Sequence, residues 1–263
     1  MPDQLHNPIE SPEFTDIDDV LAALDQIIDL SIKENSTAAL FAYVYRRTTA
    51  KVKQGIEEGR FDDNDRMELF DVAFAGKYIE AYWQYRNGEE VPEVWEQAFS
   101  PAKDNQLILQ YILLGMNAHI NYDLGIAAAE FSRDGNIQDL KADFMLINQL
   151  LEELVDEIQG RISRVSPMVF LLDWMGKNND EAIINFSINK ARGQAWNFAV
   201  RLTEAPQSHK ADIIAGVDQK MTSLARLVSN PPGFFLPKVL GVIRYFETKD
   251  VGSVIHNIQQ KNP

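Results

Sequence analysis

Four polar residues stand at alternate positions in the middle of an otherwise apolar stretch of the chain. They are Asn117, His119, Asn121 and Asp123, within the segment from Asn105 to Arg133. At 100° per residue, the apolar residues of this segment fall on most sides of a helix, which is typical of a helix buried inside a domain. A buried amide without a partner costs roughly 1 to 3 kcal/mol, and an unpaired buried carboxylate costs more. We therefore expect all four side chains to be buried and to have partners.

The four residues form two pairs with (i, i+4) spacing. On a regular helix Asn117 and Asn121 lie about 40° apart, and His119 and Asp123 lie about 40° apart on nearly the opposite side. One pair can therefore serve a site while the other ties neighbouring helices together. A single cluster of four ligands is geometrically implausible.

His119 and Asp123 have the spacing for three kinds of role. They could share a divalent metal ion, with a third ligand such as Asp71 or Asp143, although a metal is not favoured. Alternatively, the carboxylate orients the imidazole for metal-free acid or base catalysis. The third alternative is a purely structural polar network. The sequence leaves these alternatives open.

An aromatic stripe and an aspartate lie upstream of this segment. The stripe has residues at steps of four: Phe70, Phe74, Tyr78 and Tyr82. Such spacing is typical of core packing, but Tyr78 and Tyr82 with Asp71 could also line an apolar pocket. The simplest structural role for Asp71 is an ion pair with Arg46 or Arg47.

Arg192 and Trp196 also have (i, i+4) spacing, so the guanidinium can lie on the indole ring. Arg192 could bind an anionic group of a ligand, or it could neutralise Asp123 or Asp71. In an enzyme, Arg47 or Arg192 would stabilise developing negative charge.

Helical spacing of apolar residues dominates nearly everywhere, which predicts an all-α protein. The expected helices are Ile17 to Lys33, Thr37 to Gly59, Asn64 to Arg86, Ala102 to Arg133, Gln138 to Val165, Pro167 to Trp174, Asp180 to Glu204, Ser208 to Val228 and Pro237 to Phe246. Asp62, Asp63, Asn64 and Asp65 are typical of a helix N-cap. We expect one multi-helix bundle around the buried Asn105 to Arg133 helix.

The composition limits the kinds of partner and chemistry that the protein can have. The chain has 263 residues, 39 acidic against 25 basic side chains, a net charge of -14 and no cysteine. Nucleic acid is therefore an unfavourable partner, and thiolate chemistry is excluded.

We expect a loosely ordered lead-in at 1–14, an all-α domain at 15–229, and an apolar tail at 230–263 that packs on the domain. The tail is also a candidate homodimer surface. With no targeting segment and no run long enough to span a membrane, the default location is the cytoplasm.

The central segment resembles an uncharacterised, all-helical bacterial family catalogued as a domain of unknown function. The resemblance lies in the run from Leu114 to Asn121, followed by Asp123-Leu124-Gly125. Further matching positions are Tyr45, Arg47, Thr49, Phe61, Asp71, Tyr78, Asn148, Ser166-Pro167, Ala191-Arg192 and Gln194-Ala195-Trp196. The resemblance covers most of the chain and implies the fold and the choice of site, but no activity.

Three functions are consistent with these residues. The first is an enzyme acting on a small, largely apolar molecule, with His119 as acid or base, Asp123 orienting it, and a pocket that reaches His119. The second is a non-catalytic protein that binds a small molecule in a pocket walled by Tyr78, Tyr82 and Trp196. The third is a structural or interaction protein with a buried polar network. The pairs Asp25/Asp29 and Asp139/Asp143 also fit a magnesium-diphosphate enzyme, but only weakly.

Overall fold

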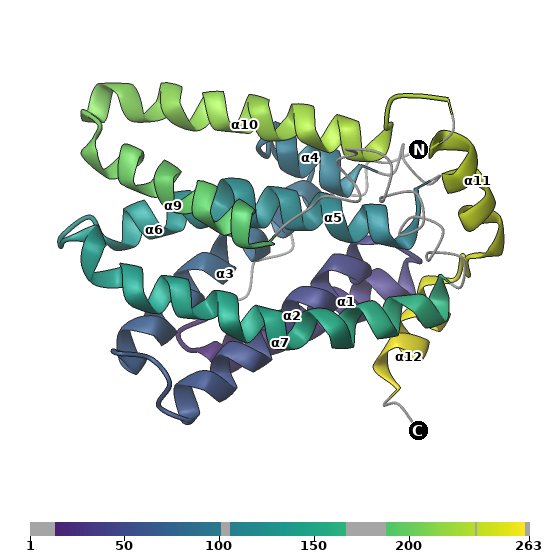
Figure 1. Cartoon of the computed structure of the whole chain (residues 1–263), viewed down its shortest axis with the longest axis horizontal. Helices are drawn as coiled ribbons and strands as arrows, with labels where there is room; N and C mark the ends of the chain where they lie inside the picture. The colour runs from purple at the N-terminus through teal and green to yellow at the C-terminus, as the bar shows by residue number, and fades with distance from the viewer. Residues whose placement is uncertain (1–13, 101–105, 167–187, 235, 261–263) are drawn as a thin grey trace, which may run out of the picture.

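The computed structural model describes residues 14–100, 106–166, 188–234 and 236–260, and every regular element in them is a helix (Figure 1). The α-helices are α1 Ile17–Lys33, α2 Ala38–Glu57, α3 Asn64–Arg86, α4 Glu93–Phe99, α5 Ile108–Ala118, α6 Leu124–Phe131, α7 Lys141–Val165, α9 Ile188–Glu204, α10 Gln207–Ser229, α11 Leu236–Phe246 and α12 Val251–Gln259. A π-helical turn, η2 His119–Asp123, joins α5 to α6, and a 3-10 turn, η3 Ile137–Leu140, precedes α7. The all-α prediction is confirmed.

The long helices lie close to where the apolar spacing predicts them. α1 and α3 have the predicted bounds, and each begins at an aspartate, Asp16 or Asp63, whose side chain accepts a hydrogen bond from a backbone N–H of the first turn. Two short helices, α4 and α12, were not predicted. The expected helix at Pro167 to Trp174 lies outside the described residues.

The chain segment α5–η2–α6 runs through the middle of the bundle (Figure 1). α5 packs against α2, α4 and α10, and α6 packs against α3 and α9. Helices that precede and helices that follow this segment in the chain therefore surround it. The predicted central helix is confirmed as buried, but it is interrupted: η2 replaces regular α-helix at His119–Asp123.

Two glycines allow the neighbouring helices to approach the central segment closely. A methyl group at Gly115 would collide with the ring of Phe41 on α2. A methyl group at Gly125 would collide with the ring of Phe198 and would lie 3.0 Å from the backbone oxygen of Ala195 on α9. Gly115 and Gly125 flank η2 in the chain. Because they have no side chain, α2 and α9 can pack closely against the central segment.

The C-terminal helices pack on the bundle. α11 buries one face in a small apolar cluster with side chains of α5 and α10: Leu107, Leu113, Leu114, Ala225, Val228, Leu236, Leu240 and Ile243. α12 accepts a hydrogen bond from the hydroxyl of Tyr43 at the backbone oxygen of Ile258, 3.1 Å away. The opposite face of α11 exposes Val242, Tyr245 and Phe246. Among the described helices, none combines the length and the apolar character needed to cross a membrane.

Candidate active site

The candidate site lies on the π-helical turn. Regular α-helical geometry puts His119 and Asp123 on one face of a helix, whereas the structure has a wider, π-helical turn at these residues. The pair nevertheless forms, because His119 Nδ1 lies 3.0 Å from Asp123 Oδ2. Short π-helical turns interrupt α-helices frequently at functional sites. The turn therefore marks this segment as the candidate site.

Asp123 is held from a second helix as well. The indole Nε1 of Trp95 on α4 donates to both carboxylate oxygens of Asp123, at 3.2 and 3.1 Å. Burial raises the pKa of Asp123, while hydrogen bonds from His119 and Trp95 act in the opposite direction. Since the indole can only donate, Asp123 serves as an acceptor, and the proton between Asp123 and His119 is assigned to His119 Nδ1.

His119 lies in an aromatic cage and is 1% exposed. Its ring stacks on Phe74 with 3.8 Å between ring centroids, and Tyr45 meets it edge-on at 4.3 Å. The rings of Phe41 and Tyr78 both lie 5.9 Å away. Burial lowers the pKa of His119, which favours the neutral imidazole. With the proton on Nδ1, the other ring nitrogen, Nε2, carries a free lone pair.

Several buried polar atoms in and beside the aromatic cage have no hydrogen-bond partner of good geometry among the described residues. We call them the unpartnered cluster: His119 Nε2, Tyr45 Oη, Tyr78 Oη, Thr49 Oγ1 and Asp71 Oδ2. Within it, the hydroxyls of Tyr45 and Thr49 interact weakly with each other. The rings of Tyr45 and Tyr78 lie 5.8 Å apart, and burial together with the charge of Asp71 raises the pKa of Tyr45. Each unmet buried group costs roughly 1 to 3 kcal/mol. This concentration of unmet groups distinguishes the site from ordinary core packing.

Asp71 does not form the predicted ion pair with Arg46 or Arg47. Those arginines pair with carboxylates on other helices: Arg46 with Asp25 of α1, and Arg47 with Glu157 of α7. Burial raises the pKa of Asp71 to about 7, against the opposing charge of Arg192. Asp71 is therefore a buried carboxyl group at the edge of the aromatic cage, and its Oδ2 has no hydrogen-bond partner among the described residues.

The other polar pair, Asn117 on α5 and Asn121 on η2, has hydrogen-bond partners. Asn121 Nδ2 donates to Asn117 Oδ1 at 3.1 Å, and Asn117 Nδ2 donates to the backbone oxygen of Met221 on α10 at 2.9 Å. Both asparagines were candidate ligand-binding residues. Their contacts instead tie the central segment to α10.

Arg192 and Trp196 are buried, but not in the predicted arrangement. The guanidinium of Arg192 lies over the ring of Phe144 at 4.5 Å and not over Trp196, which packs on the same phenylalanine at 5.0 Å. Arg192 donates to Asn148 Oδ1 and to the backbone oxygen of Phe144, both at 2.6 Å. Burial lowers the pKa of Arg192 to about 9, so the group stays charged at neutral pH. It acts on Asp71 by charge at a distance, because none of the described ion pairs joins the two.

Two further candidates have contacts outside the cage. Arg47, placed by the sequence among the catalytic residues, is about one third exposed and pairs with Glu157. Tyr82 is buried, and its hydroxyl lies 3.2 Å from Ser31 Oγ of α1. Tyr82 thus has a structural partner. Arg47 is tied to α7 through Nη2, while its Nε is buried and has no partner among the described residues.

The described residues contain no group of three side chains placed to hold a metal ion. Asp143, considered as a third ligand, accepts hydrogen bonds from the backbone of Asp62 and from Arg66 Nη2, both at 2.7 Å. It thereby anchors the start of α3. Asp25, from the acidic pairs, is engaged by Arg46. Neither aspartate is free to bind a cation.

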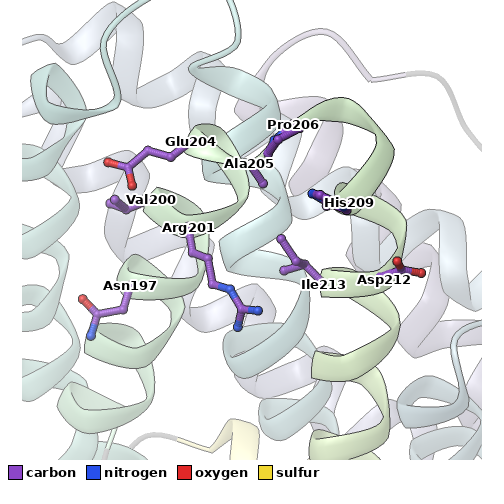
Figure 2. A pocket seen from close by; sticks show the side chains of 9 residues that line it. All are labelled: Asn197, Val200, Arg201, Glu204, Ala205, Pro206, His209, Asp212 and Ile213. Carbon is purple, nitrogen blue, oxygen red and sulfur yellow. The ribbon is translucent and has the colours of Figure 1, made fainter.

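An open hollow of about 580 Å³ lies at the turn between α9 and α10, away from the cage (Figure 2). It is lined by Asn197, Val200, Arg201, Glu204, Ala205, Pro206, His209, Asp212 and Ile213. The lining includes neither His119 nor the walls expected of a binding pocket, Tyr78, Tyr82 and Trp196. This hollow therefore corresponds to neither pocket predicted from the sequence.

Trp95 is the site residue that sequence reasoning missed. It lies on α4, a helix of seven residues. A start signal for this helix is visible in the sequence, since Pro92 precedes Glu93 and Glu96, acidic residues of the first turn. However, the contact between Trp95 and Asp123 depends on how α4 packs against α5, and one sequence does not show that.

The structure thus defines an all-helical protein with a buried histidine–aspartate pair in an aromatic cage. The chain belongs to DUF5995, a family of unknown function, whose model matches residues 17–231. The match contains all the site residues, and it leaves α11 and α12 outside. A search of the curated proteins and a search of the solved structures found no match.

Proposed function

We propose that this protein is an enzyme that acts on a small, largely apolar molecule, with His119 as its general base and acid. One observation carries the proposal: His119 Nδ1 is held by Asp123, while Nε2 is buried and has no partner in the described part of the chain. A histidine oriented by a carboxylate through one nitrogen, with the other nitrogen free, is the arrangement used in general acid–base catalysis.

The proposed roles follow from the contacts. Nε2 accepts a proton from the substrate and returns it later in the cycle. Asp123 orients the imidazole and stabilises the imidazolium formed by that transfer, and Trp95 fixes the carboxylate. The aromatic cage supplies apolar walls and excludes water, which strengthens the electrostatic contribution of Asp123. Such transfer typically contributes about 10² to 10⁴-fold to the rate.

The partner and the location are part of this proposal. The aromatic cage favours a small apolar substrate over a polymer, and the net charge of -14 disfavours nucleic acid. The exposed face of α11 is proposed as a homodimer contact. The resemblance to a bacterial family supports a bacterial protein, and the cytoplasm is proposed as its location.

A screen for turnover tests the proposal. Purified protein is incubated with a library of small apolar esters, amines, alcohols and carbonyl compounds, and conversion is followed by NMR. We expect at least one compound to be converted, with the rate falling at least about 100-fold in His119→Gln. The matched control is His209→Gln, which removes an exposed histidine from the open hollow and should leave the rate unchanged. Equal rates in both variants, or no conversion at all, would contradict the proposal.

A non-catalytic role for the same cage gives a different result. A binding protein would retain a compound without converting it, and His119→Gln would change affinity only. A structural network would bind none of the compounds. In a binding protein, as in a structural network, His119 Nε2 would take no part in proton transfer.

A further inference from the structure

The buried charges around the cage do not balance. Asp123 is engaged only by donors, and the guanidinium of Arg192 is charged. The guanidinium of Arg192 acts on Asp71, whereas Asp123 has hydrogen-bond donors but no buried cation beside it in the described part of the chain. When Asp71 is ionised, the region therefore holds two buried carboxylates and one buried guanidinium, and His119 is neutral. One negative charge is left without a counter-charge among the described buried groups, and Glu68 on α3 adds further negative potential at Asp71. An uncompensated buried charge is costly and calls for a cation.

The surroundings of Asp71 suit a nitrogen cation with an apolar body. The rings of Tyr45, Tyr78 and Phe74 supply π-faces, which attract ammonium groups. Asp71 Oδ2 has no hydrogen-bond partner among the described residues, and Tyr45 Oη and Thr49 Oγ1 have only a weak interaction with each other. An ammonium group has three hydrogen-bond donors and no acceptor, so it can satisfy several of these oxygens together. An anionic ligand would be repelled by the two carboxylates.

We propose that the unpartnered cluster is a binding site for a small apolar amine, whose ammonium group pairs with Asp71 while its apolar body lies among the aromatic rings beside His119. This inference rests on the proposed function, because it takes the cluster to be the substrate site of an enzyme. It adds the chemical class of the substrate. The charge that selects the ligand resides on Asp71, and the proton-transferring group is His119, so binding and chemistry are separable.

Three matched probes test the amine site: benzylamine, benzyl alcohol and benzoate. Their affinities are measured by calorimetry at pH 8, where a carboxyl group with a pKa of about 7 is mostly ionised. We expect benzylamine to bind at least tenfold more tightly than benzyl alcohol, and benzoate not to bind. Equal affinity for the amine and the alcohol, or no binding of benzylamine at millimolar concentration, would overturn the inference.

Two variants assign the selectivity to a residue. Asp71→Asn keeps the shape and removes the charge, so the preference for the amine should disappear while the affinity for benzyl alcohol stays within about threefold. Asp71→Glu restores the charge and should recover part of the preference. Retention of the full amine preference in Asp71→Asn would overturn the inference. Asp25→Asn removes an exposed carboxylate that pairs with Arg46 and serves as the control.

The failures of the two proposals are distinguishable. If benzyl alcohol binds as well as benzylamine, and conversion of library compounds still needs His119, then the amine inference fails alone. If benzylamine binds through Asp71 but His119→Gln changes no turnover, then the catalytic proposal fails and the amine site stands.

Discussion

Two polar pairs of the central segment have the same spacing and similar burial, but they differ in their hydrogen bonding. The pair Asn117–Asn121 satisfies itself and the backbone oxygen of Met221. The pair His119–Asp123 is anchored by Trp95, but it leaves Nε2 without a partner. Burial and spacing alone therefore do not separate a structural tie from a candidate site. What separates them is whether the buried hydrogen-bonding capacity is used up.

The largest expected effect concerns the unmet charge on the His119 side. The pKa of Asp71 is about 7 in the folded protein against about 3.9 for an ordinary aspartate, and a difference of 1 in pKa corresponds to about 1.4 kcal/mol. Ionised Asp71 therefore costs up to about 4 kcal/mol of stability. Because the folded protein holds this proton more tightly than the unfolded chain, stability is lost as pH rises from about 4 to 7.

Asp71→Asn should remove that loss. At pH 8 the variant should be more stable than the parent protein in urea unfolding, and the two should converge near pH 4. A parent protein that is as stable as Asp71→Asn across this range would show that Asp71 carries no unmet charge.

The Asn117–Asn121 side should respond to truncation with a loss of stability. Asn117→Ala leaves Asn121 Nδ2 and the backbone oxygen of Met221 without their present partner. We expect the free energy of unfolding to fall by about 3 kcal/mol. Asn197→Ala, at an exposed position on α9, is the matched control and should change stability by less than about 0.5 kcal/mol. Similar losses of stability in Asn117→Ala and Asn197→Ala would show that the pair Asn117–Asn121 does not hold the helices together.

The contribution of Trp95 can be isolated with a second tryptophan. Trp95→Phe keeps an aromatic ring and removes the N–H that donates to Asp123, so it should cost about 1 to 3 kcal/mol. Trp83 is as deeply buried, but its Nε1 has no hydrogen-bond partner in the described structure. Trp83→Phe should therefore cost less than Trp95→Phe in the same unfolding experiment. The reverse order would show that Trp95 acts through packing alone.

The smallest effect on stability is expected at His119 itself. His119→Gln should change the free energy of unfolding by less than about 1 kcal/mol relative to His209→Gln, because the glutamine amide can replace Nδ1–H as the donor to Asp123. The lost stacking on Phe74 is offset by removal of the buried Nε2, which has no partner among the described residues. Loss of several kcal/mol would indicate that His119 is a structural group like Asn117.

The sequence predicted the architecture better than the site. Apolar spacing and aspartate caps were sufficient for α1 and α3, and they identified the central segment as buried. The π-helical turn was not predictable from a regular 100° spacing, and α4 was too short for a periodic pattern. Arg192 could be predicted as buried, but its contact with Phe144 in place of Trp196 depends on how α7 and α9 pack. Nothing in the spacing shows which buried atoms lack partners, because partners come from distant helices.

The central claim is tested most directly by nitrogen-15 NMR of protein labelled at histidine. The resonances of His119 are assigned by comparison with His119→Gln, and the chemical shifts of its two ring nitrogens at neutral pH report which one carries the proton. The account predicts a neutral ring with the proton on Nδ1 and a bare Nε2 whose resonance moves when benzylamine is added. A protonated Nε2, or an Nε2 that no ligand perturbs, would contradict it.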